Sequence, residues 1–542
     1  MQEPSRPDKP AEPLADAASE TRQVHRAAGI VGAATLLSRI LGYLRDMVFA
    51  SFFGAGLASD AFIAAFRIPN MLRRLFGEGS LNVAFVPVFA DCLNRQGHAE
   101  AERLAGSALR LLAVILTAVA LLGVFGAPLL VRVLAYGFAG NPEKFTLCVN
   151  LTRIMFPYIT FIGLVALCSG ILNVLGHFAA PALAPTLLNL AMIGSVISVS
   201  WLSASQTVRV SGLAVGVLIG GAFQLGFQVP FLIRHRIRFW RRSGLWHPAL
   251  GKILTLMGPA VFGAAVFQIN QIVGTLLGSL LPQGSISYLY YADRLVQFPL
   301  GVFAIALATA VLPALSRQAS GKHWEALRET FRHALQLVFF ISLPAMAGLI
   351  VLREPIVALL FQRGAFDAQM TRLTASALLY YAIGLWAFSA VRIVLSAFFA
   401  MMDTRTPVKM AMISIAANAL CGVILMWPMQ HNGLALALSL ASVLNLGLLT
   451  MALRKKLGAI GWRRVAVSVA RSGLCASLMG GCVWAAALRL LPSAGAGGLR
   501  ILAGLIGCIV FGTVVYSGLA YLFKAPELHA VLQVVRQRKT SG

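Results

Sequence analysis

Charged side chains interrupt two apolar stretches near the start of the chain, where they could form a binding site. The first stretch contains Arg39, Arg45 and Asp46, and the second contains Asp60, Arg67, Arg73, Arg74 and Glu78. A step of seven residues in an α-helix returns to almost the same side of the helix, so each stretch is expected to carry its charges on one face. A guanidinium stays protonated and binds phosphate oxygens through paired hydrogen bonds. The pattern therefore predicts a site for a phosphate-bearing anion.

A third segment, residues 287–294, ends in Asp293 and Arg294 and is expected to complete this site. Four arginines are expected to line one aqueous chamber and to bind a diphosphate group there: Arg39, Arg45, Arg73 and Arg294. Other polar residues are expected to hold the arginines in place and to limit their mutual repulsion: Ser38, Asp46, Asp60, Arg67, Arg74, Glu78 and Asp293.

A purely structural interpretation of these charges is also open. Three sets of neighbours could form internal ion pairs that only fix helix register: Arg45–Asp46, Arg74–Glu78 and Asp293–Arg294. Arg73 and Arg74 could also lie near the cytoplasmic interface and extend their charges into water. We expect Arg153 and Arg392 to anchor helix ends.

The composition indicates that these charged segments lie in a bilayer. Of 542 residues, 58% are hydrophobic and 12% are charged, whereas a soluble domain carries roughly 45–50% apolar and about 25% charged residues. This excludes an ordinary cytosolic enzyme, a disordered chain and a secreted disulfide scaffold. Since a transmembrane helix needs about 20 residues, we predict an all-α polytopic membrane protein with fourteen spans, at 28–51, 58–90, 105–135, 148–173, 180–203, 211–233, 249–279, 286–316, 331–361, 375–401, 408–428, 433–453, 467–488 and 499–523.

Lysine and arginine are concentrated in the connections that follow even-numbered spans. Basic connections favour the cytoplasmic side, so both termini are predicted to be cytoplasmic. Topology and attraction to anionic lipid headgroups explain most of the formal charge of +26, and a nucleic-acid partner is not needed. Residues 1–26 lack an apolar segment and are rich in Pro, Ala, Asp and Glu, so we predict a disordered cytosolic tail rather than a signal peptide.

Proline and glycine positions recur with an almost constant offset. Pro87 and Pro313 lie 226 residues apart, and Gly137 and Gly364 lie 227 apart. The offset covers six spans, so both copies enter the membrane from the same side, as in a parallel repeat. We predict two six-helix lobes around a central cationic cavity, followed by two more helices and a basic cytosolic C-terminus. The predicted boundaries are 27–245, 246–460 and 461–542. This is the architecture of a transporter.

Other kinds of chemistry have little support in the sequence. The seven cysteines lie mostly in apolar segments without a C-x-x-C pair, and no histidine cluster has metal-ligand spacing. No G-x-x-x-x-G-K-[ST] motif for ATP is present. The short connections lack the carboxylate pair or metal motif that an enzyme acting on lipid-linked sugars would need. We therefore predict no enzymatic activity and no resident cofactor.

Several strings share the pattern of a known family. They are Ser38-Arg39-Ile40-Leu41-Gly42 with Arg45-Asp46, Phe53-Gly54-Ala55-Gly56 before Ser59-Asp60-Ala61-Phe62, Phe66-Arg67-Ile68-Pro69-Asn70 with Leu72-Arg73-Arg74-Leu75-Phe76, Pro181-Ala182 with Ala184-Pro185-Thr186-Leu187-Leu188-Asn189, Tyr290-Tyr291-Ala292-Asp293-Arg294-Leu295, and Thr406-Pro407-Val408-Lys409. From about residue 27 to the C-terminus, the chain resembles the MurJ (MviN) family. These proteins are the lipid II flippases of the multidrug/oligosaccharidyl-lipid/polysaccharide (MOP) superfamily.

The resemblance implies a bacterial inner-membrane transporter with fourteen helices, two six-helix lobes and a cationic cavity. It implies that the last two helices form a groove for an undecaprenyl tail. The implied substrate is lipid II, an undecaprenyl diphosphate-linked disaccharide-pentapeptide, which moves from the cytoplasmic to the periplasmic leaflet for cell-wall synthesis. Proteins of cell-wall synthesis and division are implied as further partners.

The resemblance implies that four arginines correspond to functionally important positions of the family: Arg39, Arg45, Arg73 and Arg294. Supporting positions carried over are Ser38, Asp46, Asp60, Glu78 and Ser287. In relatives position 67 can be Lys, so a positive charge alone is expected to suffice there. Some members bind sodium in the second lobe, so a monovalent cation and the membrane potential are both open as sources of coupling.

Four alternatives remain at the level of sequence. A drug or cation antiporter of the same superfamily would need a cavity dominated by unpaired carboxylates, and a flippase for another polyprenyl-diphosphate oligosaccharide would need the same cavity as a lipid II flippase. A membrane enzyme is disfavoured by the short connections. A membrane scaffold would have no use for arginines inside spans, each of which costs about 2.5–3.5 kcal/mol to insert.

Overall fold

Helices make up nearly all of the described chain, which comprises residues 13–74, 81–237, 244–458, 460–491 and 498–529 of the computed structural model. The part of the chain described contains no β-strand. Long apolar runs that lie in lipid must bond their backbone groups internally, and the α-helix does this within one segment. The predicted all-α fold of a polytopic membrane protein is confirmed.

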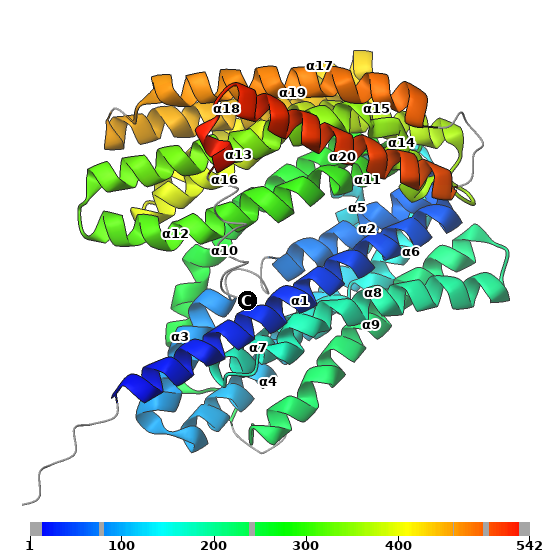
Figure 1. Ribbon diagram of the computed structural model, residues 1–542. Coiled ribbons are helices and arrows are strands. Elements are labelled where there is room, and N and C mark those ends of the chain that lie inside the picture. The colour runs from blue at the N-terminus through cyan, green and yellow to red at the C-terminus, as the bar shows by residue number, and fades with distance from the viewer. Residues whose placement is uncertain (1–12, 75–80, 238–243, 459, 492–497, 530–542) are drawn as a thin grey trace, which may run out of the picture.

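The helices of the first lobe run from α1 to α9 (Figure 1). They are α1 (Pro13–Phe53), α2 (Leu57–Arg73), α3 (Leu81–Gln96), α4 (His98–Phe125), α5 (Ala127–Leu134), α6 (Pro142–Met155), α7 (Tyr158–Val174), α8 (Ala179–Leu202) and α9 (Gln206–Arg234), with a 3-10 turn, η2 (Tyr136–Gly140), between α5 and α6.

The second lobe begins with α10 and lies beside the first (Figure 1). Its elements are α10 (Pro248–Ser279), α11 (Ser285–Pro299), a π-helical turn η3 (Leu300–Ala304), α12 (Ile305–Ser320), α13 (Trp324–Val351), α14 (Arg353–Phe361), α15 (Ala368–Ile383), α16 (Leu385–Ala400), α17 (Arg405–Met429) and α18 (His431–Leu457). Two more helices, α19 (Trp462–Leu490) and α20 (Gly498–Leu522), follow, and α19 packs on α13.

The second lobe repeats the helix pattern of the first. The long helix α4 begins at His98, and α13, its counterpart of equal length, begins at Trp324, 226 residues later. Each is followed by a short helix, α5 or α14, that contains a proline near its start. The next spans are each divided in two, α6–α7 in the first lobe and α15–α16 in the second. The offset seen in the prolines and glycines therefore extends to whole helices.

The predicted number of spans is only partly reflected in helix length and composition. Among the described residues, ten helices or joined helices are long and apolar enough to cross a membrane, and the pair α15–α16, bent by 43°, makes an eleventh. The other three predicted spans fall on α1, on α2 with α3, and on α10. Arg39, Arg45 and Asp46 lower the hydropathy of α1. The count of fourteen therefore stays a prediction.

The N-terminal tail differs from the prediction. Helix α1 begins at Pro13, well before the predicted span at residue 28, so the expected disorder of residues 1–26 was wrong for residues 13–26. The segment contains several Ala, Glu, Arg and Gln residues, which favour a helix even outside a bilayer. The remainder of the predicted tail, residues 1–12, lies outside the described residues.

Besides the packing of the start of α10 on α3, the lobes contact each other at the C-terminal ends of α1 and α10. A Cβ atom at Gly137 would lie 2.1 Å from the Ser279 carbonyl oxygen at the end of α10, and one at Gly364 would lie 2.3 Å from that of Ser51 at the end of α1. The two contacts are equivalent under the repeat. Only glycine allows backbones to approach this closely, and Gly364 also has a φ of +58°.

A buried aromatic cluster reinforces this end of the interface. The Tyr291 ring of α11 lies 6.4 Å from the Phe49 ring of α1 and 4.9 Å from the Phe361 ring of α14, measured between centroids. The Tyr291 hydroxyl donates a hydrogen bond to the Gly54 carbonyl oxygen over 3.1 Å. The lobes are thus held together at one end of α1, which leaves the central cavity beside the middle of this helix.

Candidate functional site

A cavity of about 960 Å³ lies between the lobes. Its wall comes from α1, α2, α7, α8 and α9 of the first lobe and from α10, α11, η3, α12, α16 and α18 of the second. Among the described residues, six arginines and two aspartates line it: Arg39, Arg45, Arg73, Arg74, Arg294, Arg392, Asp46 and Asp293. The lining therefore has a formal charge of +4, and the four arginines expected to share one chamber do line the same cavity.

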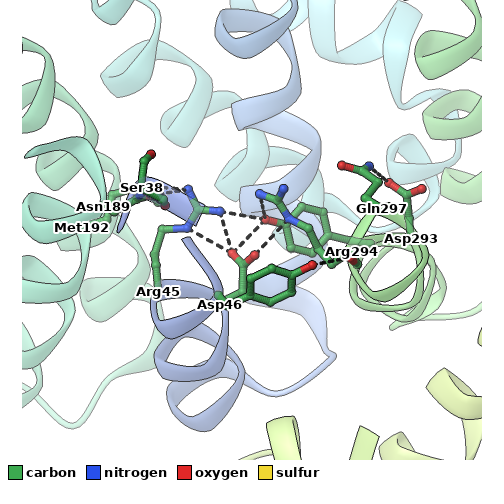
Figure 2. Close-up of polar contacts among 10 residues, drawn as sticks. Ser38, Arg45, Asp46, Asn189, Met192, Asp293, Arg294 and Gln297 are labelled. Atoms are coloured by element: carbon green, nitrogen blue, oxygen red, sulfur yellow. Dashed lines mark hydrogen bonds and ion pairs between the residues drawn. The ribbon is translucent and has the colours of Figure 1, made fainter. Parts of the chain in front are cut away.

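Asp46 is the acid around which two of these arginines are organised. Arg45 donates to its Oδ1 through Nε over 3.0 Å and through Nη2 over 2.6 Å. From the other lobe, Arg294 Nε forms an ion pair with Asp46 Oδ2 over 2.9 Å. Figure 2 shows the Asp46 carboxylate between the two guanidinium groups. One carboxylate thus pairs with two guanidinium groups, so the three side chains together carry one net positive charge.

Tyrosine and asparagine side chains fix the orientation of this trio. The Tyr290 hydroxyl donates to Asp46 Oδ1 over 3.0 Å, and it accepts from Arg45 and Arg294 over 3.3 Å each. Arg45 Nη1 also donates to Asn189 Oδ1 of α8 over 3.1 Å. These contacts hold Arg45, which is only 8% exposed, so the helices α1, α8 and α11 meet at one polar network.

Arg39 differs from Arg45 because it makes no hydrogen bond or ion pair with any described residue. Its side chain is exposed and lines the cavity six residues before Arg45 on α1. A Cβ atom at Gly301 of η3 would lie 2.4 Å from Arg39 Nη1, so the guanidinium extends from the first lobe to the surface of the second. The backbone carbonyl of Ser38 accepts a hydrogen bond from Asn189 Nδ2 over 3.2 Å.

Four other predicted residues lie beside the same network. Arg73 Nε donates to Asn70 Oδ1 over 3.0 Å, and Arg74 lines the cavity on the same helix. Arg67 extends from α2 to α10, where its Nη1 donates to the Gln271 carbonyl and to the Thr275 hydroxyl. Asp293 accepts a hydrogen bond from Gln297 one turn later on α11. Arg67 and Asp293 line a smaller recess of about 100 Å³ next to Arg45 and Asp46.

Asp60 and Ser287 lie together, but away from the cavity. Asp60 is 1% exposed. Its Oδ1 accepts from the Ser287 hydroxyl over 2.7 Å and from the Ser287 backbone N–H over 3.0 Å, and its Oδ2 accepts from the Gly284 N–H and from Lys144 Nζ. These bonds join α2 and α6 of the first lobe to the start of α11. Asp60 therefore lies in the contact between the lobes.

The structure also places at these sites several residues that no sequence pattern singles out. Lys144, the partner of Asp60, lies near the start of α6. Asn189 belongs to a string that carries the family resemblance, but its partner Arg45 lies 144 residues away. Arg392 was expected at a helix end; this was wrong, since it lies in the middle of α16 and lines the cavity. Glu78 lies outside the described residues.

This arrangement can bind an anion much better than a cation. The positively charged groups come from both lobes, and in the described part of the chain no residue occupies the donors of Arg39. Guanidinium groups suit phosphate oxygens because of their planar pair of N–H donors. Among the described residues, no group of three His, Cys, Asp or Glu side chains is arranged as a metal site.

Comparison with known proteins identifies the family. A family model described as "Lipid II flippase MurJ" matches residues 49–497. The chain is 40% identical over 427 residues to a "Probable lipid II flippase MurJ" of Vibrio cholerae, covering 78% of this chain and 81% of the relative. It is 36% identical over 512 residues to the "Lipid II flippase MurJ" of Burkholderia cenocepacia, covering 92% and 97%.

Solved structures agree with this assignment. A structure named "Lipid II flippase MurJ, inward closed conformation" superposes with a TM-score of 0.76 at 26% identity, covering 91% of this chain and 98% of the other. An inward-facing multidrug resistance MATE family transporter of the MOP superfamily has the same fold at 17% identity, with a TM-score of 0.68 over 78% of this chain and 95% of the other. The chain therefore belongs to the lipid II flippase MurJ family of multi-pass bacterial membrane transporters.

Proposed function

We propose that this protein moves lipid II from the cytoplasmic to the periplasmic leaflet of the bacterial inner membrane, for cell-wall synthesis. The observation that carries the proposal is the cavity between the lobes, with six arginines against two aspartates among its described lining residues. A diphosphate is the anionic link between the lipid and the headgroup of this substrate. A transporter of cationic drugs would need the opposite charge in its cavity.

The arginines of the cavity bind the diphosphate in this proposal. Arg39 supplies donors that no described residue occupies, and Arg45, Arg73 and Arg294 lie on the same cavity. Asp46 holds Arg45 and Arg294 while no ligand is bound. A diphosphate between the lobes would compensate the excess positive charge of the six arginines. Their mutual repulsion would then fall, which favours closure of the lobes around the substrate.

Transport follows from alternating closure of the two ends of the cavity. The lobes contact each other at the end of α1 opposite its N-terminus, through Asp60, Gly364 and the aromatic cluster. With both termini in the cytoplasm, as the basic connections favour, this contact lies on the periplasmic side. The headgroup then enters from the cytoplasm, and rocking of the lobes breaks this contact and releases the headgroup outside.

The polyprenyl chain stays in lipid along α19 and α20. Exposed apolar side chains along both helices support this part of the proposal, and they are Leu474, Leu478, Trp484 and Leu488 on α19 and Leu502, Ile506, Val510 and Val514 on α20. Only the headgroup then needs the polar cavity. Anionic lipids would contact the basic cytoplasmic connections, and proteins of cell-wall synthesis and division would be further partners.

Movement of the cavity's net charge would couple transport to the membrane potential. Each elementary charge that crosses the field contributes about 2.3 kcal/mol per 100 mV. A monovalent cation such as sodium is the other candidate for coupling. Replacing sodium by potassium at constant potential, and then collapsing the potential at constant sodium, separates the two. The proposal involves no chemical conversion of the lipid.

Depletion of the protein tests the proposed function. Precursor should accumulate in the cytoplasmic leaflet, where a membrane-impermeant probe added outside spheroplasts cannot reach it. Purified protein should also bind undecaprenyl diphosphate lipids and should not bind lipophilic cations. Unchanged access of the probe to lipid II after depletion would refute the proposed transport, and tight binding of lipophilic cations would favour an antiporter.

A further inference from the structure

Arg392 is a cavity arginine that the proposed diphosphate site does not use. It lies in the middle of α16, and its side chain is exposed to the cavity. Around it, Phe388, Val391 and Leu395 of the same helix also line the cavity, and so does Leu438 of α18. Arg392 is thus one positive charge on an otherwise largely apolar part of the second lobe.

No described acidic side chain compensates this charge. Arg392 makes no side-chain hydrogen bond or ion pair with a described residue. The charge that acts on it from the opposite lobe is that of Arg74, which is also positive. The cavity's two described aspartates are engaged elsewhere, Asp46 with Arg45 and Arg294, and Asp293 with Gln297. An arginine within a membrane-spanning helix that pairs with no described acid is costly and usually faces a functional partner, so an anion is expected at this position.

Uncharged polar groups on the neighbouring helix α18 face the same space. Leu438, Ser442 and Asn445 follow one another at helical spacing on the cavity wall. The Asn445 Oδ1 atom is buried and has no hydrogen-bond partner among the described residues. An asparagine amide can accept from a peptide N–H, or after a turn of the amide it can donate to a carboxylate.

We propose that Arg392, with Ser442 and Asn445, forms a second anion-binding subsite that takes a carboxylate of the peptide stem of the headgroup. The inference rests on the proposed function, which supplies a headgroup with a pentapeptide. Such a peptide ends in a carboxylate and carries backbone N–H groups. One guanidinium matches one carboxylate in charge and in paired hydrogen bonds.

Arg392 comes from a different helix than the arginines proposed for the diphosphate. Arg39, Arg45, Arg73 and Arg294 lie on α1, α2 and α11, whereas Arg392 lies on α16. The cavity of about 960 Å³ is far larger than a diphosphate, so it has room for the rest of the headgroup beyond the first group of arginines. The peptide carboxylates are the remaining anionic groups of that headgroup.

Binding of two probes to the purified full-length protein tests the inference. Arg392→Gln should weaken binding of lipid II about ten-fold, as expected when a charge-assisted pair is lost, and it should leave binding of undecaprenyl diphosphate unchanged within two-fold. Arg392→Lys should lose less affinity for lipid II. The matched control is Arg153→Gln on α6, an exposed arginine that lines neither described cavity, and it should bind both probes like the wild type.

A third probe identifies the group that Arg392 binds. Lipid II with amidated peptide carboxylates should bind the wild type about ten-fold more weakly than lipid II does, and Arg392→Gln should not weaken it further. Equal loss of both original probes in Arg392→Gln would overturn the inference and assign Arg392 to the diphosphate. No loss for either probe, with an unchanged thermal unfolding temperature, would also overturn it. Failure of the wild type to bind lipid II would instead refute the proposed function, and this inference with it.

Discussion

Asp46 determines how the arginines of the cavity behave before substrate arrives. Its carboxylate is 2% exposed and is shared by Arg45 and Arg294, which belong to different lobes. Buried pairs of this kind do little for stability in themselves, because desolvation offsets much of their attraction. Their value here is to hold two guanidinium groups in a defined position while leaving one positive charge uncompensated.

Loss of either arginine should abolish transport without loss of the protein. Arg45→Ala and Arg294→Ala are each expected to fail to support growth in a cell depleted of its flippase, because the diphosphate loses a charge-assisted partner. Arg294→Lys, which keeps the charge, should retain partial growth. Immunoblotting of membranes checks that abundance stays near normal. Full growth of the alanine variants would contradict the site, and disappearance of the protein would show a structural role instead.

Asp60 should matter for stability rather than for ligand binding. In Asp60→Ala, Lys144 would stay buried without its acid, and the N–H groups of Gly284 and Ser287 would lose their acceptor. Breaking a buried ion pair in this way costs about 3–5 kcal/mol. A lower thermal unfolding temperature of the purified protein measures the loss.

A matched double variant separates charge from packing at Asp60. In Asp60→Asn with Lys144→Met, both charges are removed and the volume is nearly kept, so part of the lost stability should return. An unfolding temperature that is the same in wild type and Asp60→Ala would contradict the structural role.

The sequence could predict which residues carry charge in the cavity, but not how they divide into sites. Helical spacing places Asp60, Arg67 and Arg74 on one face of α2, and Asp60 and Arg67 do both bond to the second lobe. Spacing along one helix cannot tell where the neighbouring lobe comes close and where it leaves a cavity. For the same reason Arg392 could not be assigned, since its surroundings come from α12 and α18.

At the level of helices, Gly364 and Gly137 are tightly constrained because they lie against the C-terminal ends of α1 and α10. Gly364→Ala places a Cβ against the Ser51 carbonyl and forces an unfavourable φ, so we expect a destabilised lobe contact and a lower unfolding temperature. Gly137→Ala should also lower the unfolding temperature, because its Cβ would meet the Ser279 carbonyl. Gly226→Ala is the matched control, since nothing lies within 4 Å of that Cβ in the interior of α9. A neutral effect at both positions would show that the two backbones can separate freely.

Element boundaries followed from sequence where apolar runs and prolines coincided. The offset of 226 residues between Pro87 and Pro313 recurs between α4 and α13, because a repeat of sequence is a repeat of helices. The start of α1 at Pro13 does not follow from composition, because polar residues are typical of disorder and these particular ones also favour a helix. Divided spans such as α15–α16 depend on tertiary packing, which no local pattern records.

For the whole molecule, closure of the lobes at one end makes a direct test of rocking possible. The hydroxyl oxygens of Ser59 and Ser287 lie 3.0 Å apart across the lobe contact, so cysteines at both positions can form a disulfide with little adjustment. Oxidised Ser59→Cys/Ser287→Cys should still bind lipid II but should not transport it, and reduction should restore transport.

Single-cysteine variants control for the seven native cysteines in this test. Each of Ser59→Cys and Ser287→Cys alone should transport equally with and without oxidant. Full transport by the oxidised double variant, with the cross-link verified by mass spectrometry of the joined peptides, would refute a rocking motion that opens this end.

The unequal distribution of polar groups over the two walls has a consequence for cargo entry. Four of the six cavity arginines belong to α1 and α2, whereas α16 and α18 together present one. Because one wall of the cavity is more positive than the other, the electric field across the cavity orients a long, unevenly charged molecule. Its most negative end turns toward the wall formed by α1 and α2. Cargo would therefore arrive already oriented, and a molecule with the same groups joined in reverse order would be rejected even though it fits by size.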